Sequence, residues 1–376
     1  MIVEVRPGPM TNKGGELMLH AVADRLSGRH DLVVDHWIGP YAARARLGLL
    51  QKLWWKRLGP LAGLPGLIVP RSVRQAYGLV TEREIESVLD ASGFAYGDQF
   101  GPERTERAAA NAHRWRGRGL HFILLPQAFG PFSSTRIRRA AHSLLSQADL
   151  VYARDAISLR AVQGLGTDAD IRLAPDITVG LNANPPADVQ AEGAPHGYLI
   201  PNEKMLTHAD AEVAASYPAF LEMMVRELRA RGVQPILLIH ETAGGDRRLA
   251  TAVSDRVAGG VPIIEELDPL RLKGLIATAV IVAGSRFHAL LAALSQGVPV
   301  IAAGWSHKYR SLLDAYGSAD ALLEPPASPE AVRACLDRAL GPTRDTAVAA
   351  LRTCAAQQRA QVEIMWDEVL TALASP

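Results

Sequence analysis

A predicted strand–helix–strand unit in the C-terminal third of the chain is the strongest constraint on the fold of this sequence. Residues 279–283 and 298–302 are short apolar runs, the first of them rich in valine and isoleucine, which is typical of strands buried in a parallel sheet. Residues 286–296 between them have helical spacing, with three leucines on one face. Two strands joined by a helix in this way predict a parallel sheet with helices packed against it.

The same alternation of strand-like and helix-like segments continues through most of the 376 residues, which predicts an α/β fold. Residues 182–195 are rich in proline, alanine and polar side chains, as linkers are. We therefore expect N-terminal and C-terminal α/β domains over 1–181 and 196–345, and a helix over 346–376 that packs back on the N-terminal domain. Two such Rossmann-like, doubly wound domains facing a cleft would bind ligands there.

The composition excludes several classes of protein. Forty lysines and arginines nearly balance 39 aspartates and glutamates, and 48% of the residues are hydrophobic, which is typical of a soluble globular protein that does not bind nucleic acid. Cys335 and Cys354 have no metal-ligand spacing, which favours a reducing compartment and no tight metal site. The first residues lack the pattern of a signal peptide, and no apolar run reaches the roughly 18 residues of a membrane span. We expect a cytoplasmic protein.

One turn carries the strongest signal for a binding site. The sequence Ser285-Arg286-Phe287-His288 follows the strand over 279–283 directly, where the next helix begins. In α/β proteins this position presents free backbone N–H groups and the positive end of the helix dipole, so anions bind there. A guanidinium and an imidazole at the same place predict a site for a phosphate or a carboxylate.

A glycine-rich turn follows the first predicted strand, residues 2–5. Asn12, Gly14 and Gly15 open a helix there, and glycine at such a turn lets a ligand or a second backbone segment approach closely. The glycine spacing is neither that of a dinucleotide site nor that of a P-loop. A role in ligand binding and a role in simple turn geometry both remain open.

Polar side chains follow or flank other predicted strands in the N-terminal half: Asp98, Gln127, Arg154 and Asp176. Gln127 falls in a predicted loop, PQAFGPF, after a strand over 120–125. A structural interpretation is open for several of them, because Arg154 can pair with Asp155 or Asp176, and Asp176 can cap a turn.

In the C-terminal half, His240 and Glu241 follow a strand over 234–239, and Lys308 lies in the loop WSHK. His240 and Asp246 can simply hold the intervening loop in shape. The residues alone do not decide between this and a role in catalysis.

The segment over 47–69, LGLLQKLWWKRLGPLAGLPGLIV, mixes two tryptophans with lysines and arginine. Its first half resembles a basic amphipathic helix, which makes it a candidate for peripheral contact with a membrane or with a lipid-linked acceptor. The alternative is a helix packed on its neighbour with its cations in water. Pro60 and Pro65 limit the helix to the first half of the segment.

Several motifs in order make the chain similar to the polysaccharide pyruvyl transferases. They span residues 12–313 and read NKGGELML, LPQAFGPF, YARDAIS, APDITVGL, LLIHETAGGD and GSRFHALLAALSQGVPVIAAGWSHKYRSLL. The resemblance implies a two-domain fold similar to the GT-B glycosyltransferases. It also implies transfer of the pyruvyl group of phosphoenolpyruvate (PEP) to a sugar as a ketal, without metal. Residues 39–93 match no motif, and acceptor recognition is expected to vary there.

The resemblance and the residue chemistry together suggest roles. PEP carries a phosphate and a carboxylate, so it needs two groups of donors, and the expected donor-binding residues are Ser285, Arg286, Phe287, Arg154, Lys308, Gly14 and Gly15. The expected acceptor-binding residues are Asn12, Gln127 and Glu241. PEP is then a co-substrate, and no other cofactor is expected.

The reaction also needs a proton for the methylene carbon of PEP. His288 is the first choice for this acid, or for stabilising the departing phosphate, and His240 is the second. Asp98 and Asp176 are candidate bases or ligands of acceptor hydroxyls. The acceptor is expected to be a glycan or a lipid- or nucleotide-linked sugar, met at the cytoplasmic face of the membrane.

Two other functions stay open on the sequence. A GT-B-type glycosyltransferase or sugar-nucleotide epimerase shares the fold but binds a nucleotide in its C-terminal half, where Glu324 is a candidate ligand of the ribose. A non-catalytic carbohydrate-binding protein on the same scaffold is the third candidate.

Overall fold

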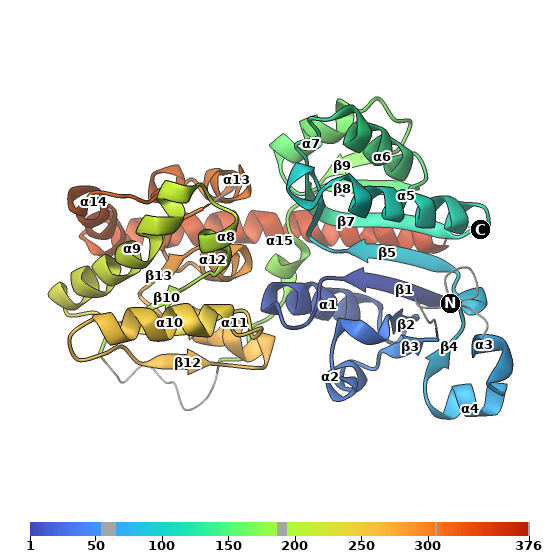
Figure 1. Cartoon of the computed structure of the whole chain (residues 1–376), viewed down its shortest axis with the longest axis horizontal. Helices are drawn as coiled ribbons and strands as arrows, with labels where there is room; N and C mark the ends of the chain where they lie inside the picture. The colour runs from blue at the N-terminus through green and yellow to red at the C-terminus, as the bar shows by residue number, and fades with distance from the viewer. Residues whose placement is uncertain (54–64, 186–193, 305–306, 375–376) are drawn as a thin grey trace. The chain divides into compact units, whose positions relative to one another are not determined.

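The computed structural model describes residues 1–53, 65–185, 194–304 and 307–374, and it contains two compact units (Figure 1). The N-terminal unit comprises Met1–Met10, Gly15–Ile177 and Gln361–Pro376, and the C-terminal unit comprises Thr11–Gly14 and Thr178–Ala360. The boundaries differ from those expected at residues 181 and 346. The short turn at Thr11–Gly14 groups with the second unit, and so does the first part of the C-terminal helix.

The N-terminal unit is built on a parallel sheet of nine strands in the order β4-β3-β2-β1-β5-β7-β8-β9, with β6 paired to β7. The strands are β1 (Ile2–Pro7), β2 (Asp31–Val34), β3 (Leu50–Lys52), β4 (Leu79–Val80), β5 (Ser87–Ala91), β6 (Phe94–Tyr96), β7 (His121–Phe129), β8 (Leu150–Ala153) and β9 (Ile171–Leu173). The order reverses at β1, whose two neighbours are β2 and β5.

Helices cover both faces of this sheet. The helices of the unit are α1 (Lys13–Leu26), α2 (Tyr41–Arg46), α3 (Pro65–Ile68), α4 (Arg71–Ala76), α5 (Pro102–Arg116), α6 (Thr135–Leu145), α7 (Ala156–Gln163) and the end of α15 (Arg344–Ala374). Trp115 of α5 packs on Phe122 of β7 on one face. On the other face the hydroxyl of Tyr152, in β8, donates to Glu368 of α15. Apolar side chains alternate along the strands because successive residues point to opposite faces.

The C-terminal unit has a parallel sheet of five strands in the order β12-β11-β10-β13-β14. The strands are β10 (His196–Ile200), β11 (Gln234–Ile239), β12 (Ile263–Glu265), β13 (Ile281–Gly284) and β14 (Val300–Ala302). The helices of the unit are α8 (Lys204–Thr207), α9 (Ala211–Ala230), α10 (Gly245–Arg256), α11 (Pro269–Thr278), α12 (Phe287–Leu294), α13 (His307–Ala315), α14 (Pro329–Leu340) and the start of α15. Tyr198 and Ile200 pack toward α11 and α12, whereas Leu199 between them packs toward α9. Both faces of the sheet are therefore buried, as its apolar strands predict.

The expectation of a helix in the first half of residues 47–69 is wrong where the structure describes it. Leu50–Lys52 forms strand β3, and Lys52 is buried with its ammonium 2.7 Å from the carboxylate of Glu4 in β1. Lys52 therefore cannot belong to a basic face in water or on a membrane. Trp54, Trp55 and the rest of the predicted helix lie outside the described residues. None of the described helices is long and apolar enough to cross a bilayer.

Strand β7 is longer than expected. The sequence predicted a strand over 120–125 and a loop after it, but β7 continues through Phe129. Gln127 is consequently inside the sheet and fully buried, not in a loop. The Pro126 ring at its centre did not end the strand, because the ladder with β8 shifts its register between Leu124 and Gln127.

Candidate active site

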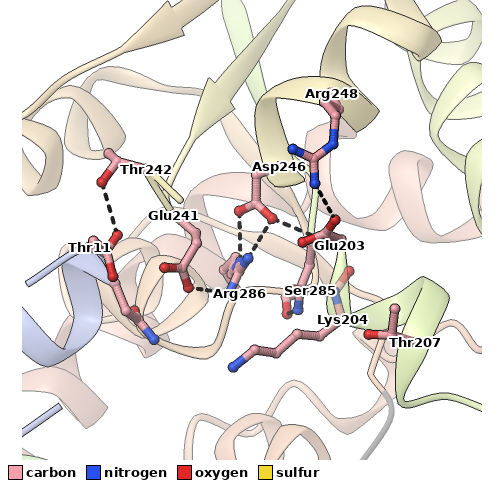
Figure 2. Close-up of polar contacts among 12 residues, drawn as sticks. Thr11, Glu203, Lys204, Thr207, Glu241, Thr242, Asp246, Arg248, Ser285 and Arg286 are labelled. Atoms are coloured by element: carbon pink, nitrogen blue, oxygen red, sulfur yellow. Dashed lines mark hydrogen bonds and ion pairs between the residues drawn. The ribbon is translucent and has the colours of Figure 1, made fainter. Parts of the chain in front are cut away.

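The turn that was predicted to bind an anion, residues 285–288, lies at the carboxyl edge of the C-terminal unit's sheet. Glu203 lies beyond β10, Glu241 beyond β11 and Arg286 beyond β13, so parallel strands bring residues that are far apart in the sequence to one edge (Figure 2). The strand order reverses at β10, which lies between β11 and β13. Such a reversal opens a crevice outside the carboxyl ends of the strands, the usual ligand site of doubly wound folds.

Arg286 is held by two carboxylates of the same unit. Its Nε donates to Oδ2 of Asp246 at 2.8 Å, its Nη2 donates to the other oxygen of Asp246, and its Nη1 donates to Glu241 at 3.2 Å. Burial by itself lowers the pKa of Arg286, but the charge and hydrogen bonds of Asp246, helped by Glu241, outweigh it and raise the pKa. Most of the donor capacity of the guanidinium is therefore used by protein carboxylates. The geometry gives Arg286 a positioning role in the turn.

His240, directly after β11, is the most unusual side chain of the site. It is 1% exposed, and neither ring nitrogen has a hydrogen-bond partner among the described residues. Burial, followed by the nearby charges of Arg286, His288 and Lys13, holds its pKa well below 6.5. The imidazole is therefore neutral at pH 7, with one nitrogen able to donate a hydrogen bond and the other able to accept one.

The glycine-rich turn at Thr11–Gly14 lies against this edge. Asn12 forms an isolated antiparallel bridge with Glu241, the amide of Thr242 donates to the carbonyl of Thr11 at 2.9 Å, and Lys13 donates from its amide to the carbonyl of His240 at 3.3 Å. The side chain of Asn12 accepts from the amide of Gly14 at 3.0 Å, which closes the turn.

Gly14 is needed because an imidazole occupies the space of a side chain. A Cβ atom at Gly14 would lie 2.1 Å from Nδ1 of His288. The turn and the first residues of α12 are thus fitted to each other. The sequence assigned Gly14 to donor binding, Asn12 and Glu241 to acceptor binding and His288 to catalysis, and the structure places these four residues in contact or next to one another.

Ser285 fixes the start of the turn. Its hydroxyl is bonded to that of Tyr217, and its carbonyl accepts from the side chains of Asn202 and Tyr309, each at 2.6 Å. With Ser285 fully buried, these contacts give it a structural role. Beyond it, α12 begins without a side-chain cap on its first amides.

Phe287 and His288 follow at the start of α12. The Phe287 ring is buried, while His288 is partly exposed. Lys308, at the start of α13, places its ammonium 5.9 Å from the centroid of the Phe287 ring. Lys308 therefore belongs to the same edge of the sheet.

The other predicted site residues lie in the N-terminal unit with structural partners. Arg154 pairs with Asp176 at 2.7 Å, and both are buried. Both carboxylate oxygens of Asp98 accept from the amide of Ser133, at 3.0 and 3.1 Å.

Gln127 and Gly15 also have structural contacts in that unit. Gln127 accepts from the hydroxyl of Ser92 at 3.1 Å. A Cβ atom at Gly15 would lie 3.2 Å from the backbone of Gly8, so the close packing of two backbone segments accounts for this glycine. Nε2 of Gln127, in contrast, is buried without a hydrogen-bond partner among the described residues.

Comparison with known proteins decides the family. The model of the polysaccharide pyruvyl transferase family matches residues 12–307, which is most of the chain. The chain belongs to this family. The match makes the protein a transferase of a family that modifies polysaccharides, and the matched range contains every expected catalytic, donor-binding and acceptor-binding residue except Lys308. None of the curated proteins matches the sequence.

Solved structures with the same fold include glycosyltransferases and epimerases. Anabaena HepE in complex with UDP and glucose has a TM-score of 0.62 at 15% identity, covering 100% of this chain and 99% of that one. UDP-GlcNAc 2-epimerase from Neisseria meningitidis bound to UDP-GlcNAc has a TM-score of 0.59 at 9% identity, covering 99% and 100%. The rhamnosyltransferase SpnG has a TM-score of 0.53 at 14% identity over the full length of both chains. The expectation of two Rossmann-like domains of the GT-B type is confirmed.

Several residues at this edge of the sheet were not among the expected site residues. Asp246 was considered only as a partner of His240 in shaping a loop, although it is the main partner of Arg286. The motif LLIHETAGGD contains it, so its position after two glycines at a helix start was the available signal. Asn202 and Tyr217 had none, because they act through single hydrogen bonds to Ser285. Lys204, at the start of α8, passes below Arg286 in the view of Figure 2.

Proposed function

We propose that this protein transfers the pyruvyl group of PEP to two hydroxyl groups of a sugar as a ketal and releases inorganic phosphate. Family membership supports the reaction class. The observation that carries the assignment of the site is the buried His240 imidazole, without a hydrogen-bond partner among the described residues, next to the start of α12. A buried polar group of this kind is costly unless a ligand completes its hydrogen bonds.

PEP suits the groups that meet at this edge. The first amides of α12 and its helix dipole favour an anion, and His288 and Lys308 lie at the same edge. Neutral His240 can donate a hydrogen bond to a second anionic oxygen without needing a counter-charge. Arg286 orients this set through its contacts with Asp246 and Glu241.

The reaction balances with the groups present. An acid protonates the methylene carbon of PEP, which leaves an oxocarbenium-like centre at C2. One sugar hydroxyl attacks this centre, phosphate leaves, and the second hydroxyl closes the ketal. One hydroxyl proton replaces the one given to the new methyl group, and the other departs with the phosphate. We assign the acid to His288, because it is the more exposed of the two histidines and can exchange protons with water.

A direct test monitors the protein with PEP and a panel of sugars and nucleotide- or lipid-linked sugars. Phosphate release together with a new ketal methyl signal in the proton NMR spectrum is the expected result for at least one acceptor. The His288→Asn variant is expected to lose the activity while its melting temperature still rises with PEP. A thermal shift with UDP-sugars and none with PEP would instead identify a glycosyltransferase or an epimerase, and no shift with any ligand would favour a non-catalytic binding protein.

A further inference from the structure

The N-terminal unit contains a second candidate site. A cavity of about 550 Å3 lies at the carboxyl edge of its sheet, and its lining includes Asp35, Trp37, Asp90, Ser92, Arg104 and Arg107. Asp35 follows β2, and Ser92 follows β5, on the two sides of β1. The cavity is therefore at the reversal of strand order in this sheet, the position that binds ligands in doubly wound folds. It contains none of the residues discussed above as donor ligands.

An aromatic side chain stands at the cavity. Trp37 is 56% exposed, which is unusual for so large an apolar group, and it lies two residues after Asp35 in the chain. Much of its ring is therefore open to contact with a ligand. An exposed aromatic ring can pack against the C–H face of a sugar.

Hydrogen-bonding groups lie beside this ring. Asp90 is 2% exposed, and its carboxylate accepts from the amide of Ser92 at 3.0 Å and from the hydroxyl of Tyr96. Burial, followed by the charge of Glu4, raises the pKa of Asp35 against the opposing effects of Lys52 and Arg6. Fixed carboxylates and a hydroxyl are the groups that distinguish sugar hydroxyls from water.

Two arginines complete the cavity. Arg104 and Arg107 lie one turn apart on α5, both are exposed, and neither forms an ion pair within the described ranges. The acidic residues of the same helix turns, Glu103 and Glu106, pair instead with Arg136 of α6. Two guanidinium groups without carboxylate partners are matched to a phosphate or diphosphate.

We propose that this cavity binds the acceptor as a sugar that carries a phosphate on its anomeric carbon. The sugar ring packs on Trp37, its hydroxyls bond to Asp35, Asp90 and Ser92, and its phosphate binds Arg104 and Arg107. Nucleotide-linked and lipid-linked sugars share this chemistry. The role of this ligand as acceptor rests on the proposed pyruvyl transfer, whereas the binding of a sugar phosphate in the cavity does not depend on that reaction.

The test is isothermal titration calorimetry of the full chain with matched probes. These are methyl glycosides of glucose, galactose, mannose and N-acetylglucosamine, the corresponding 1-phosphates, the UDP-sugars and farnesyl-diphosphate-linked sugars. A 1-phosphate is expected to bind more tightly than its methyl glycoside. The two diphosphate-linked series show whether a nucleotide or a lipid follows the phosphate.

Variants connect the binding to the cavity. The double substitution of Arg104→Ala and Arg107→Ala is expected to weaken the 1-phosphate about 10- to 100-fold, and Trp37→Ala is expected to weaken both the phosphate and the glycoside about 10-fold. Arg139→Ala, an exposed arginine on α6, is the matched control and leaves the affinity unchanged. All of these side chains are exposed, and the melting temperature of each variant confirms that it is folded.

A thermal shift with PEP, measured on the same proteins, separates this inference from the proposed function. If PEP stabilises the protein but no sugar phosphate binds, the inference is overturned and the proposed pyruvyl transfer is unaffected. The same conclusion follows if PEP stabilises the protein and the cavity variants bind the sugar phosphate as tightly as the wild type does. If a sugar phosphate binds in the wild type and is lost in the cavity variants while PEP has no effect, the cavity is established and the proposed reaction fails.

Discussion

Both carboxylate oxygens of Asp246 accept hydrogen bonds from the guanidinium of Arg286, and the Nε–Oδ2 distance is 2.8 Å. The Asp246 side chain is 0% exposed and that of Arg286 is 7% exposed, so the pair is closed off from water. It joins the first turn of α10 to the residue that precedes α12. Both helices begin at the edge where PEP is proposed to bind, so the pair sets the distance between their N-terminal ends.

Removal of Arg286 is expected to destabilise the fold as well as the site. Arg286→Ala leaves the Asp246 carboxylate buried without its charged partner, and breaking a buried pair in this way costs about 3–5 kcal/mol. Urea denaturation followed by circular dichroism measures the change. Arg248→Ala removes an exposed ion pair with Glu203 from the same region and is expected to cost no more than about 1 kcal/mol. Equal costs for the two variants would contradict a buried structural pair.

The fit between Gly14 and His288 predicts a specific rescue. Gly14→Ala places a methyl group where the imidazole lies and is expected to cost about 1–3 kcal/mol of the free energy of unfolding. In the His288→Ala background the same methyl group meets no ring, so the cost is expected to fall below about 1 kcal/mol. Denaturation of the wild type, the two single variants and the double variant gives the coupling energy. Additive effects would mean that the ring and the glycine do not share this space.

His240 predicts a pH dependence of stability. Its pKa is lowered in the folded state. Below pH 6.5 the imidazole therefore binds a proton in the unfolded chain but stays neutral in the folded chain. Its contribution to stability is therefore present above pH 6.5 and is lost as the pH falls toward the folded pKa, at up to about 1.4 kcal/mol per pH unit. Unfolding free energies between pH 7 and 5.5 should fall less steeply for His240→Gln than for the wild type. Parallel slopes, or an NMR titration of His240 near pH 6.5, would contradict this.

Lys52 offers a test of the segment that was expected to be a basic helix. Lys52→Ala leaves Glu4, which is 1% exposed, with Arg6 as its remaining cationic partner. We expect a loss of about 3 kcal/mol in the free energy of unfolding, because a buried charge loses its partner. Arg46→Ala, an exposed residue of α2, is the control and should change stability by less than about 0.5 kcal/mol. If Lys52→Ala leaves the free energy of unfolding unchanged, Lys52 is exposed to water and its burial against Glu4 is wrong.

The sequence predicted the C-terminal unit well because its signals are local. Strands β13 and β14 are short apolar runs, and the turn between β13 and α12 follows at once in the sequence. Parallel pairing then carries the ends of β10 and β11 to the same edge. The placement of Glu241 and His288 at one edge was therefore predictable from motifs at strand ends, whereas the contact of Asn12 with Glu241 was not.

Other features depend on partners far apart in the chain. Lys52 is buried because Glu4 lies beside it, 48 residues earlier, and nothing in the local sequence indicates this. The local sequence predicts that Arg286 binds an anion, but its carboxylate partners lie 40 and 45 residues upstream. The cavity of the N-terminal unit is not predictable from the local sequence for the same reason, because its wall is assembled from segments between Val5 and Asn111.

The turn at Thr11–Gly14 has a consequence for how such enzymes can be divided and recombined. The backbone passes from one unit to the other after residues 10, 14, 177 and 360. A fragment cut at residue 178 would lack the four residues that bridge Glu241 and pack on His288. A chimera of two related proteins would therefore need residues 11–14 and its C-terminal half from the same parent, although residues 1–10 belong to the N-terminal unit.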